Sequence, residues 1–471
     1  MDRSTAILLA LVSYFVALLG LGWIARARTH DAAGFYLGGR TLGPWVAALA
    51  ANASSSSAWS LIGVSGFACK EGLAALWLLP GCLGGFLLNW IVVAPRLRTA
   101  TGTALTLTDY LAGPPGTPLR RPIATVASLL TLGCLAIYVA SQMQAAGPAF
   151  LRALDTTPAN GIVLGAVVVV AYTLLGGYLA VSITDMLQGL LMAAVAVVVP
   201  IAAVLHLGGV GAFADAVAQV PADGFAGGFG DRSGTVAAGF AIGLCGIGLG
   251  YPGQPHAVNK YMGMAPGASM AVARAVGIGW AVALFSGMIV VGLAARAAWA
   301  VPPGEHEAAL YVASHQLFPP IVDGLVLAAV LAAIMSTVDS QLLVCASCVT
   351  HDLGLGGQGR RLGMLATARG TVLAIGALAT VAALLLRKSV FDNVLFAWAA
   401  LGSAFGPLLL VRLCLGPVAP RWALAAIVTG GGGAIAGSYV EVLGPGVADR
   451  VLSWLAAGFL AWIGSRIARD R

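Results

Sequence analysis

The sequence predicts an all-α polytopic membrane protein of about thirteen transmembrane helices, and three observations support this fold class. First, 59% of the 471 residues are hydrophobic, only 9% are charged and the mean hydropathy is +0.93, whereas soluble domains carry about 25% charged residues. Second, apolar runs of roughly 20 residues, the length that crosses a bilayer, follow one another along the chain. Third, two of these runs contain residues that interrupt a regular helix.

The apolar runs leave no segment for a separate soluble domain. In chain order, the predicted spans are 5–25, 42–68, 73–94, 123–149, 160–176, 186–206, 234–255, 269–295, 320–348, 367–386, 392–413, 422–442 and 450–467. The longest gap, 207–233, is a connection rich in Gly, Ala and Asp, without a core of its own. We therefore expect one transmembrane domain over 1–471, inserted as a multi-pass protein in the cell inner (plasma) membrane.

The formal net charge of +7 could indicate a nucleic-acid partner, but the basic residues are not clustered on a soluble segment. They lie in short loops between apolar runs, where Lys and Arg orient membrane helices. With the N-terminus outside and the C-terminus inside, most of them, Lys260 included, would lie in inner loops. We therefore predict an N-out/C-in orientation and no nucleic-acid partner.

The second span is interrupted by four consecutive serines between Asn52 and Trp59. Hydroxyls at this depth would be poorly placed against lipid. Irregular backbone in a membrane persists only where protein buries it or where it lines a wet cavity. Such broken helices mark the substrate and ion sites of secondary transporters.

The seventh span is interrupted as well, because residues 243–255 (GLCGIGLGYPGQP) are rich in glycine and contain two prolines. Glycine and proline both disfavour a continuous helix. The two interrupted spans are five helices apart, which is the pattern of two inverted five-helix repeats. The alternative is that Gly and Pro are simply common in membrane helices.

Several motifs together resemble the sodium/solute symporter family, and most closely its sodium/proline branch. They are residues 35–43 (FYLGGRTLG), 53–59 (ASSSSAW), 105–110 (LTLTDY), 176–182 (GGYLAVS) with Thr184 and Asp185, 250–256 (GYPGQPH), 333–337 (AIMST) and 341–344 (QLLV). The resemblance implies a LeuT-type fold with a 5+5 inverted-repeat core. It divides the chain into a leading helix and loop (1–41), a ten-helix core (42–413) and two trailing helices (414–471).

The resemblance also implies a sodium site made of oxygen ligands, which suit a hard cation. Its matching positions here are the carbonyls of Ala53, Ser56 and Ala333 and the hydroxyls of Ser336 and Thr337. Without the motif, the two hydroxyls could equally bond the preceding helical turn or pack helices together.

Two acids are candidates for a sodium pathway. Asp185 matches a family aspartate that matters for sodium passage, although an aspartate at the mouth of the predicted span 186–206 could instead be a helix N-terminal residue favoured by the dipole. Asp339 follows Thr337 by two residues, whereas Ser55 stands where the proline branch has an aspartate. Ile247 replaces a pocket tryptophan of that branch. We hypothesise that Asp339 supplies the missing negative charge.

A small solute should bind near the bilayer midplane, between the two breaks. Helix N-terminal amides would meet a carboxylate there, and an apolar wall would meet the side chain. The candidate substrate residues are Ser54, Ser57, Trp59, Tyr138, Tyr251, Gln254 and Pro255. Tyr138 is favoured because polar residues follow it on its helix, and His256 is interpreted as a loop residue that faces the cytoplasm.

We therefore predict a non-enzymatic, sodium-coupled importer of proline or a similar amino acid, with Na+, the solute and the bilayer as its partners and no obligate protein partner. A rival within the class is a sodium- or proton-coupled symporter of another solute, such as a monocarboxylate or pantothenate. A less favoured alternative is a nutrient sensor built on a transporter fold.

Overall fold

The computed structural model describes residues 3–26, 37–154, 156–175, 178–301, 304–356, 361–385, 389–441 and 444–469. Helices dominate this part of the chain, and its one β-bridge pairs Leu42 with Met264. Residues 35–36 and 176–177 of the sequence motifs lie outside the described residues.

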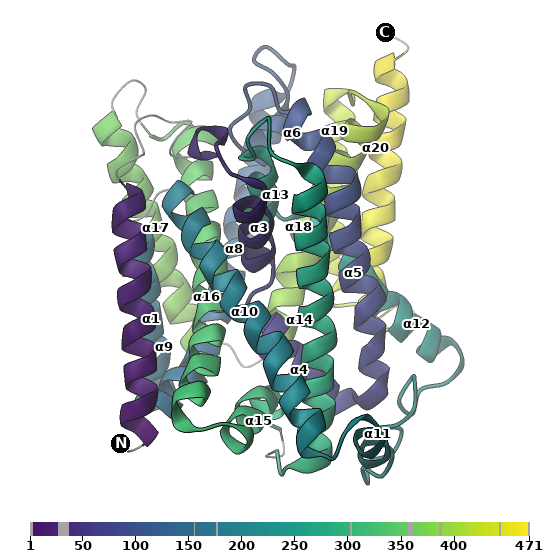
Figure 1. Ribbon diagram of the computed structural model, residues 1–471. Coiled ribbons are helices and arrows are strands. Elements are labelled where there is room, and N and C mark those ends of the chain that lie inside the picture. The colour runs from purple at the N-terminus through teal and green to yellow at the C-terminus, as the bar shows by residue number, and fades with distance from the viewer. Residues whose placement is uncertain are drawn as a thin grey trace.

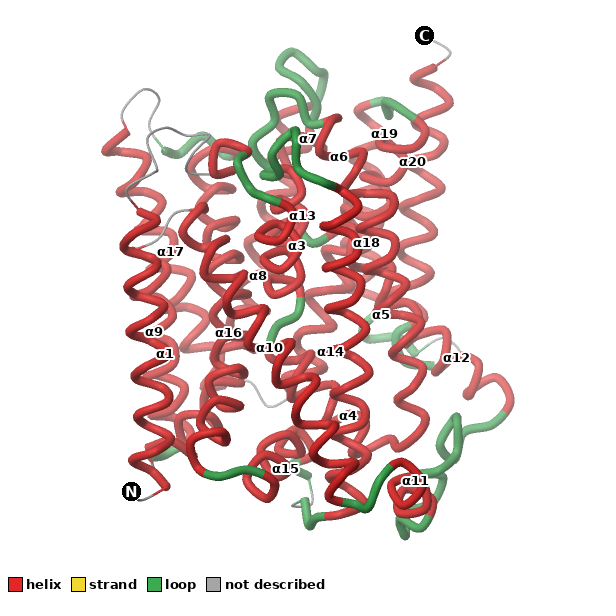
Figure 2. Tube along the Cα trace, in the orientation of Figure 1, coloured by secondary structure: helices red, strands yellow, loops and turns green. Residues whose placement is uncertain are grey.

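The α-helices form a bundle of roughly parallel elements (Figures 1 and 2). They are α1 (Arg3–Arg26), α3 (Pro44–Ser55), α4 (Val64–Glu71), α5 (Leu78–Leu88), α6 (Ala94–Ala100), α7 (Leu107–Ala112), α8 (Arg120–Leu154), α9 (Pro158–Leu175), α10 (Tyr178–His206), α11 (Val210–Ala218), α12 (Gly234–Cys245), α13 (Pro255–Met262), α14 (Met270–Ala298), α15 (Ala309–Leu317), α16 (Pro320–Ser347), α17 (Arg361–Leu385), α18 (Val390–Leu415), α19 (Pro420–Gly437) and α20 (Ser453–Arg469).

Short helical turns of other pitch join or extend these helices. They are η1 (Gly38–Arg40), η2 (Trp59–Gly63), η3 (Gly72–Trp77), η4 (Asn89–Val93), η5 (Gly246–Gly253), η6 (His306–Ala308), η7 (Cys348–Asp352) and η8 (Val447–Leu452). Within the described residues, nine continuous helical runs are long and apolar enough to cross a membrane. The chain is an integral membrane protein.

All thirteen predicted spans fall on helical segments, but two details differ from the sequence prediction. The sixth span begins at Tyr178 and not at residue 186, because the polar residues ahead of that position continue the helix inside the bundle. The connection 207–233 is also not wholly irregular, since it contains α11. In Figure 1, α1 begins at the lower end of the bundle and α20 ends at the upper end, while α11 and α15 lie at the lower end.

The bundle is apolar outside and partly polar inside. Large exposed apolar side chains such as Val16, Val198 and Leu378 lie on outer helices, where a bilayer would cover them. Many Ser, Thr, Asn and Gln side chains are instead buried. Helices α16 and α18 are the most enclosed of the long helices in the described part of the chain.

The two interrupted spans are broken where the sequence predicts. Helix α3 ends at Ser55, and Ser56 has φ −116° and ψ 76° before helical backbone resumes near η2. Helix α12 tightens into η5, Gln254 is extended at φ −91° and ψ 103°, and Pro255 begins α13. Proline suits that first helical position, because its missing N–H would have no partner there.

Candidate functional site

The first break brings its backbone oxygens against the hydroxyls of α16. Ser336 Oγ donates to the carbonyl of Ala53 at 3.2 Å and to that of Ala333 at 3.2 Å. Thr337 Oγ1 donates to the carbonyl of Ser54 at 3.1 Å. Every residue of this cluster is 0% exposed, so four of the five predicted sodium ligands meet in one buried place.

The spacing of these oxygens suits a shared cation. Oxygens arranged octahedrally about 2.4 Å from a hard cation lie about 3.4 Å from one another, close to the distances between the hydroxyl and carbonyl oxygens here. A hydroxyl can rotate its proton away and turn a lone pair inward. The cluster can therefore accept a cation by exchanging hydrogen bonds for ion contacts, with little backbone movement.

The fifth predicted ligand, Ser56, lies in the break itself, and its hydroxyl has no hydrogen-bond partner among the described residues. Ser55, which replaces the family aspartate, is buried and donates to the carbonyl of Asn52 at 3.1 Å. It therefore caps the end of α3 and adds no charge to the cluster.

Asp185 is not at a helix terminus. It lies in the interior of α10, is 0% exposed, and forms an ion pair of 2.9 Å with Lys260. Its Oδ2 also accepts from Ser54 Oγ at 3.1 Å and from Ser340 Oγ at 3.2 Å. The helix-dipole explanation is therefore wrong, because α10 starts two turns earlier than predicted. Ser54 links Asp185 to the oxygen cluster at the first break.

Asp339 is also 0% exposed, and its Oδ1 accepts from the backbone amide of Ser340. Its Oδ2 has no hydrogen-bond partner among the described residues. Both predicted acids thus contact Ser340, Asp185 from α10 and Asp339 as its neighbour in α16.

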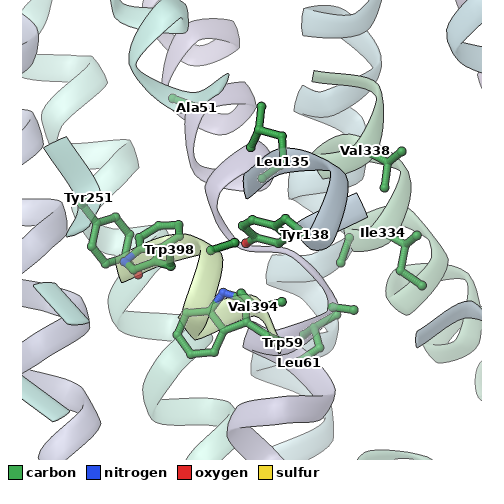
Figure 3. Close-up of a cluster of buried hydrophobic side chains, with 14 of the residues drawn as sticks. Ala51, Trp59, Leu61, Leu135, Tyr138, Tyr251, Ile334, Val338, Val394 and Trp398 are labelled. Carbon is green, nitrogen blue, oxygen red and sulfur yellow. The ribbon is translucent and has the colours of Figure 1, made fainter. Parts of the chain in front are cut away.

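The candidate substrate residues Trp59 and Tyr138 lie in one cluster of buried side chains (Figure 3). Tyr138 donates to Ser57 Oγ at 3.2 Å, and Trp59 packs on Phe285 and Phe391 with ring centroids 5.9 and 5.7 Å apart. Ser54 Oγ instead donates a hydrogen bond to Asp185. Of the predicted substrate residues in this break, Ser57 and Trp59 therefore stay grouped with Tyr138, while Ser54 belongs to the oxygen cluster that contains Thr337.

The second break contributes the remaining candidate substrate residues. Tyr251 packs between Phe86 and Trp398, with ring centroids 4.7 and 4.6 Å away. Gln254 Nε2 donates to the carbonyls of Gly250 at 3.1 Å and Trp398 at 3.0 Å. Pro255 follows as the first residue of α13, and all three predicted residues of this break are buried.

His256 does not lie in a loop. It is 1% exposed on α13, packs edge-on against Tyr138 at 5.9 Å, and neither ring nitrogen has a hydrogen-bond partner among the described residues. The prediction failed because the helix that follows the break folds back into the bundle, so residues next to the break stay buried.

A cavity of 670 Å³ leads towards this region from the lower end of the bundle. It is lined by α4, α8, η6, α15 and α18, including Phe67, Lys70, Glu307 and Phe391. Phe391 lines this vestibule and also packs on Trp59, so it lies between the vestibule and that candidate substrate residue.

The opposite side of the site is tightly packed. Tyr178 donates to the carbonyl of Asn259 at 2.8 Å, and the Leu107 amide donates to Asn259 Oδ1 at 3.2 Å. A cavity of 20 Å³ lies there, enough for about one water molecule. The vestibule therefore approaches the site from one end of the bundle, and packed side chains cover the site on the other side.

Four residues that the sequence interpretation missed complete the site. Ser340 and Lys260 contact Asp185, Gln142 Oε1 accepts from the Ala58 amide at 3.0 Å, and Trp398 Nε1 donates to the Ile247 carbonyl at 3.0 Å. Lys260 was expected in an inner loop. Its signal in the sequence was its position only five residues after Pro255, within one short helix of the break.

Known proteins resemble the chain over nearly its whole length. The family model described as "Sodium:solute symporter family" matches residues 35–430. The osmoregulated proline transporter OpuE of Bacillus subtilis (strain 168) is 36% identical over 439 residues, which cover 91% of this chain and 87% of OpuE. The high-affinity proline transporter PutP of the same organism is 34% identical over 470 residues, which cover 96% of this chain and 98% of PutP.

Solved structures share the fold at lower identity. A Na+-coupled sialic acid symporter in a substrate-bound outward-open state aligns with a TM-score of 0.81 and 18% identity, over 99% of this chain and 98% of that chain. MhsT in complex with L-phenylalanine aligns with a TM-score of 0.56 and 14% identity, over 90% and 98%. The predicted all-helical LeuT-type fold is confirmed, and the chain belongs to the sodium:solute symporter family.

Proposed function

We propose that the protein imports a small organic solute, proline or a similar amino acid first, in symport with sodium. The observation that carries this proposal is the meeting of Ser336 and Thr337 with the free carbonyls of the first break. The similarity to two bacterial proline transporters over most of the chain supports the choice of solute.

Sodium is held by the carbonyls of Ala53, Ser56 and Ala333 and the hydroxyls of Ser336 and Thr337. Asp185 and Asp339 provide negative charge on the α10 side of this site and form part of the pathway of the ion. Because the hydroxyls join α16 to the first break, a bound ion ties two parts of the bundle together. Ion binding then favours the conformation in which these parts are in contact.

The solute binds between the two breaks, where Ser57, Trp59, Tyr138, Tyr251, Gln254 and Pro255 surround it. In the proposed N-out/C-in orientation, the 670 Å³ vestibule faces the outside and the packed side faces the cytoplasm. The solute enters when Trp59 and Phe391 separate. Each charge that crosses 100 mV of membrane potential contributes about 2.3 kcal/mol to accumulation.

The protein works in the cell inner (plasma) membrane and needs no obligate protein partner. Purified protein in proteoliposomes tests these points together. We expect uptake of labelled proline that rises when an inward sodium gradient replaces choline at fixed pH, and that unlabelled proline suppresses more strongly than a monocarboxylate or pantothenate. Uptake that follows a proton gradient and ignores sodium would contradict the coupling, and stronger suppression by another solute class would contradict the substrate.

A further inference from the structure

Three ionisable side chains are buried where α10, α13 and α16 meet. Asp185 and Asp339 are 0% exposed and Lys260 is 1% exposed. A charge buried in a membrane protein is costly unless an opposite charge lies close to it. With all three side chains ionised, two negative charges face one positive charge, so one negative charge is left over.

The ammonium of Lys260 occupies a well-defined place. Its Nζ donates to Asp185 Oδ2 at 2.9 Å and to Ser182 Oγ at 3.2 Å, and it lies 4.9 Å from the centre of the Tyr178 ring. Carboxylate, hydroxyl and aromatic face together replace the water around an ammonium ion. The ammonium of Lys260 is therefore surrounded by groups that would also suit a free bound cation.

The ammonium of Lys260 lies next to the proposed sodium site at Ser336 and Thr337. Asp185 Oδ2, which accepts from Lys260, also accepts from Ser54, and the carbonyl of Ser54 accepts from Thr337. Two carboxylate oxygens nearby, Asp185 Oδ1 and Asp339 Oδ2, have no hydrogen-bond partner among the described residues. Negative charge thus remains available beside the cluster after Lys260 has formed its contacts.

We propose that Lys260 is a tethered cation that takes the place of a second sodium ion beside Asp185, so that the protein binds one sodium ion per cycle. This inference rests on the proposed sodium site at Ser336 and Thr337. One sodium ion there brings the sum of buried charges to zero. Without the charge of Lys260, two sodium ions are needed to reach the same balance.

Equilibrium binding of 22Na+ to the purified full-length protein in nanodiscs tests the inference without any solute. We expect one ion per wild-type protein and two per Lys260→Gln protein, with the Hill coefficient rising from about 1 towards about 2. Lys260→Arg keeps the charge and should bind one ion. Lys70→Gln removes a lysine charge from the exposed end of α4 and serves as the matched control, also with one ion.

A second pair of variants keeps the test decisive if Lys260→Gln does not fold. Asp185→Asn alone leaves Asp339 balanced by Lys260, so sodium binding should weaken about tenfold or more. Asp185→Asn combined with Lys260→Gln leaves one buried acid again, and binding of one ion should return. Affinity is measured per folded protein, because removing both partners of a merely structural ion pair would restore the amount of folded protein but would leave the sodium affinity unchanged in all of these variants.

The outcomes separate the two proposals. A wild-type protein that binds no sodium contradicts the proposed function, and the role of Lys260 falls with it. One ion in both the wild type and a folded Lys260→Gln protein, two ions in the wild type, or no recovery in the double variant contradicts the role of Lys260 while the sodium coupling stands.

Discussion

The two breaks are both buried interruptions of a membrane helix, but they offer different chemistry. At the first break, the freed carbonyls of Ala53 and Ser54 meet hydroxyls of α16. At the second break, the carbonyls of Ile247 and Tyr251 meet N–H donors, from Trp398 at 3.0 Å and from Asn89 at 3.2 Å.

This difference decides what each break can bind. A hydroxyl both donates and accepts, so it can turn a lone pair to a cation, whereas an indole or amide N–H only donates. The first break therefore suits sodium. The second break has its carbonyls occupied and its aromatic rings packed close, which suits the wall of a solute pocket. Glycine makes this packing possible, since a Cβ on Gly250 would come within 2.2 Å of the Trp398 indole nitrogen.

The largest effect should follow from removing the hydroxyls opposite the first break. A hydrogen-bond partner of a charged group is worth about 1.5–3 kcal/mol, and 1.4 kcal/mol is a factor of ten in affinity. We expect Ser336→Ala or Thr337→Ala to raise the half-saturating sodium concentration about tenfold or more, and the double variant to raise it about a hundredfold. Sodium titration of proline uptake measures this effect.

The matched control is Ser403→Ala on α18, which removes a buried hydroxyl that donates to the carbonyl of Asp449, away from both breaks. Its half-saturating sodium concentration should stay near that of the wild type. If Ser403→Ala and Ser336→Ala shift it equally, the first break is not the ion site.

The next largest effect should follow from neutralising Asp339. Asp339→Asn keeps the size of the side chain but removes its charge, so we expect about a tenfold loss of sodium affinity. Ser55→Asp in the Asp339→Asn background should restore part of that affinity, because it places an acid at the first break again. Direct 22Na+ binding measures both changes.

Asp323→Asn is the control for this prediction, since Asp323 lies in the first turn of the same helix. An Asp339→Asn protein with unchanged sodium affinity would reject the idea that this residue compensates for Ser55.

Changes at the second break should have a smaller effect, and on proline affinity instead of sodium affinity. Trp398→Leu removes the ring that packs on Tyr251, and Gly250→Ala pushes that ring away. Both should raise the half-saturating proline concentration about fivefold, because a lost aromatic contact costs about 0.5–1.5 kcal/mol. Sodium binding measured without solute should stay within about twofold of the wild type.

Trp77→Leu, near the edge of the bundle on Phe229, is the control for Trp398. Loss of sodium binding in Trp398→Leu, with proline affinity kept, would reverse the assignment of the two breaks.

The smallest effect should arise outside both breaks. Glu307 caps the start of α18 by accepting from the amides of Val390 at 3.3 Å and Phe391 at 3.0 Å. Charge at a helix N-terminus is worth about 0.3–1 kcal/mol, so Glu307→Gln should lower the melting temperature by about 1–2 °C. A loss of sodium affinity in this variant would mean that the vestibule, and not the first break, controls the ion.

Much of the fold was predictable because a bilayer imposes a simple rule on sequence. Spans must be apolar for roughly 20 residues, so the predicted ranges could be placed on helical segments, with the start of the sixth range as the main error. The breaks were predictable for the same reason, since serines, glycines and prolines stand out in such runs. Ser336 and Thr337 could be placed through their motif, and their contact with the first break agrees with it.

The sequence by itself determined which segments form apolar helices and where two of them break, because those properties depend on neighbouring residues. Only the tertiary structure decided which side chains meet at the breaks. Lys260 and Asp185 are 75 residues apart, and Trp398 reaches Ile247 across 151 residues. A buried charge is stable only beside its partner, and no local pattern of residues specifies a partner that folding alone brings near.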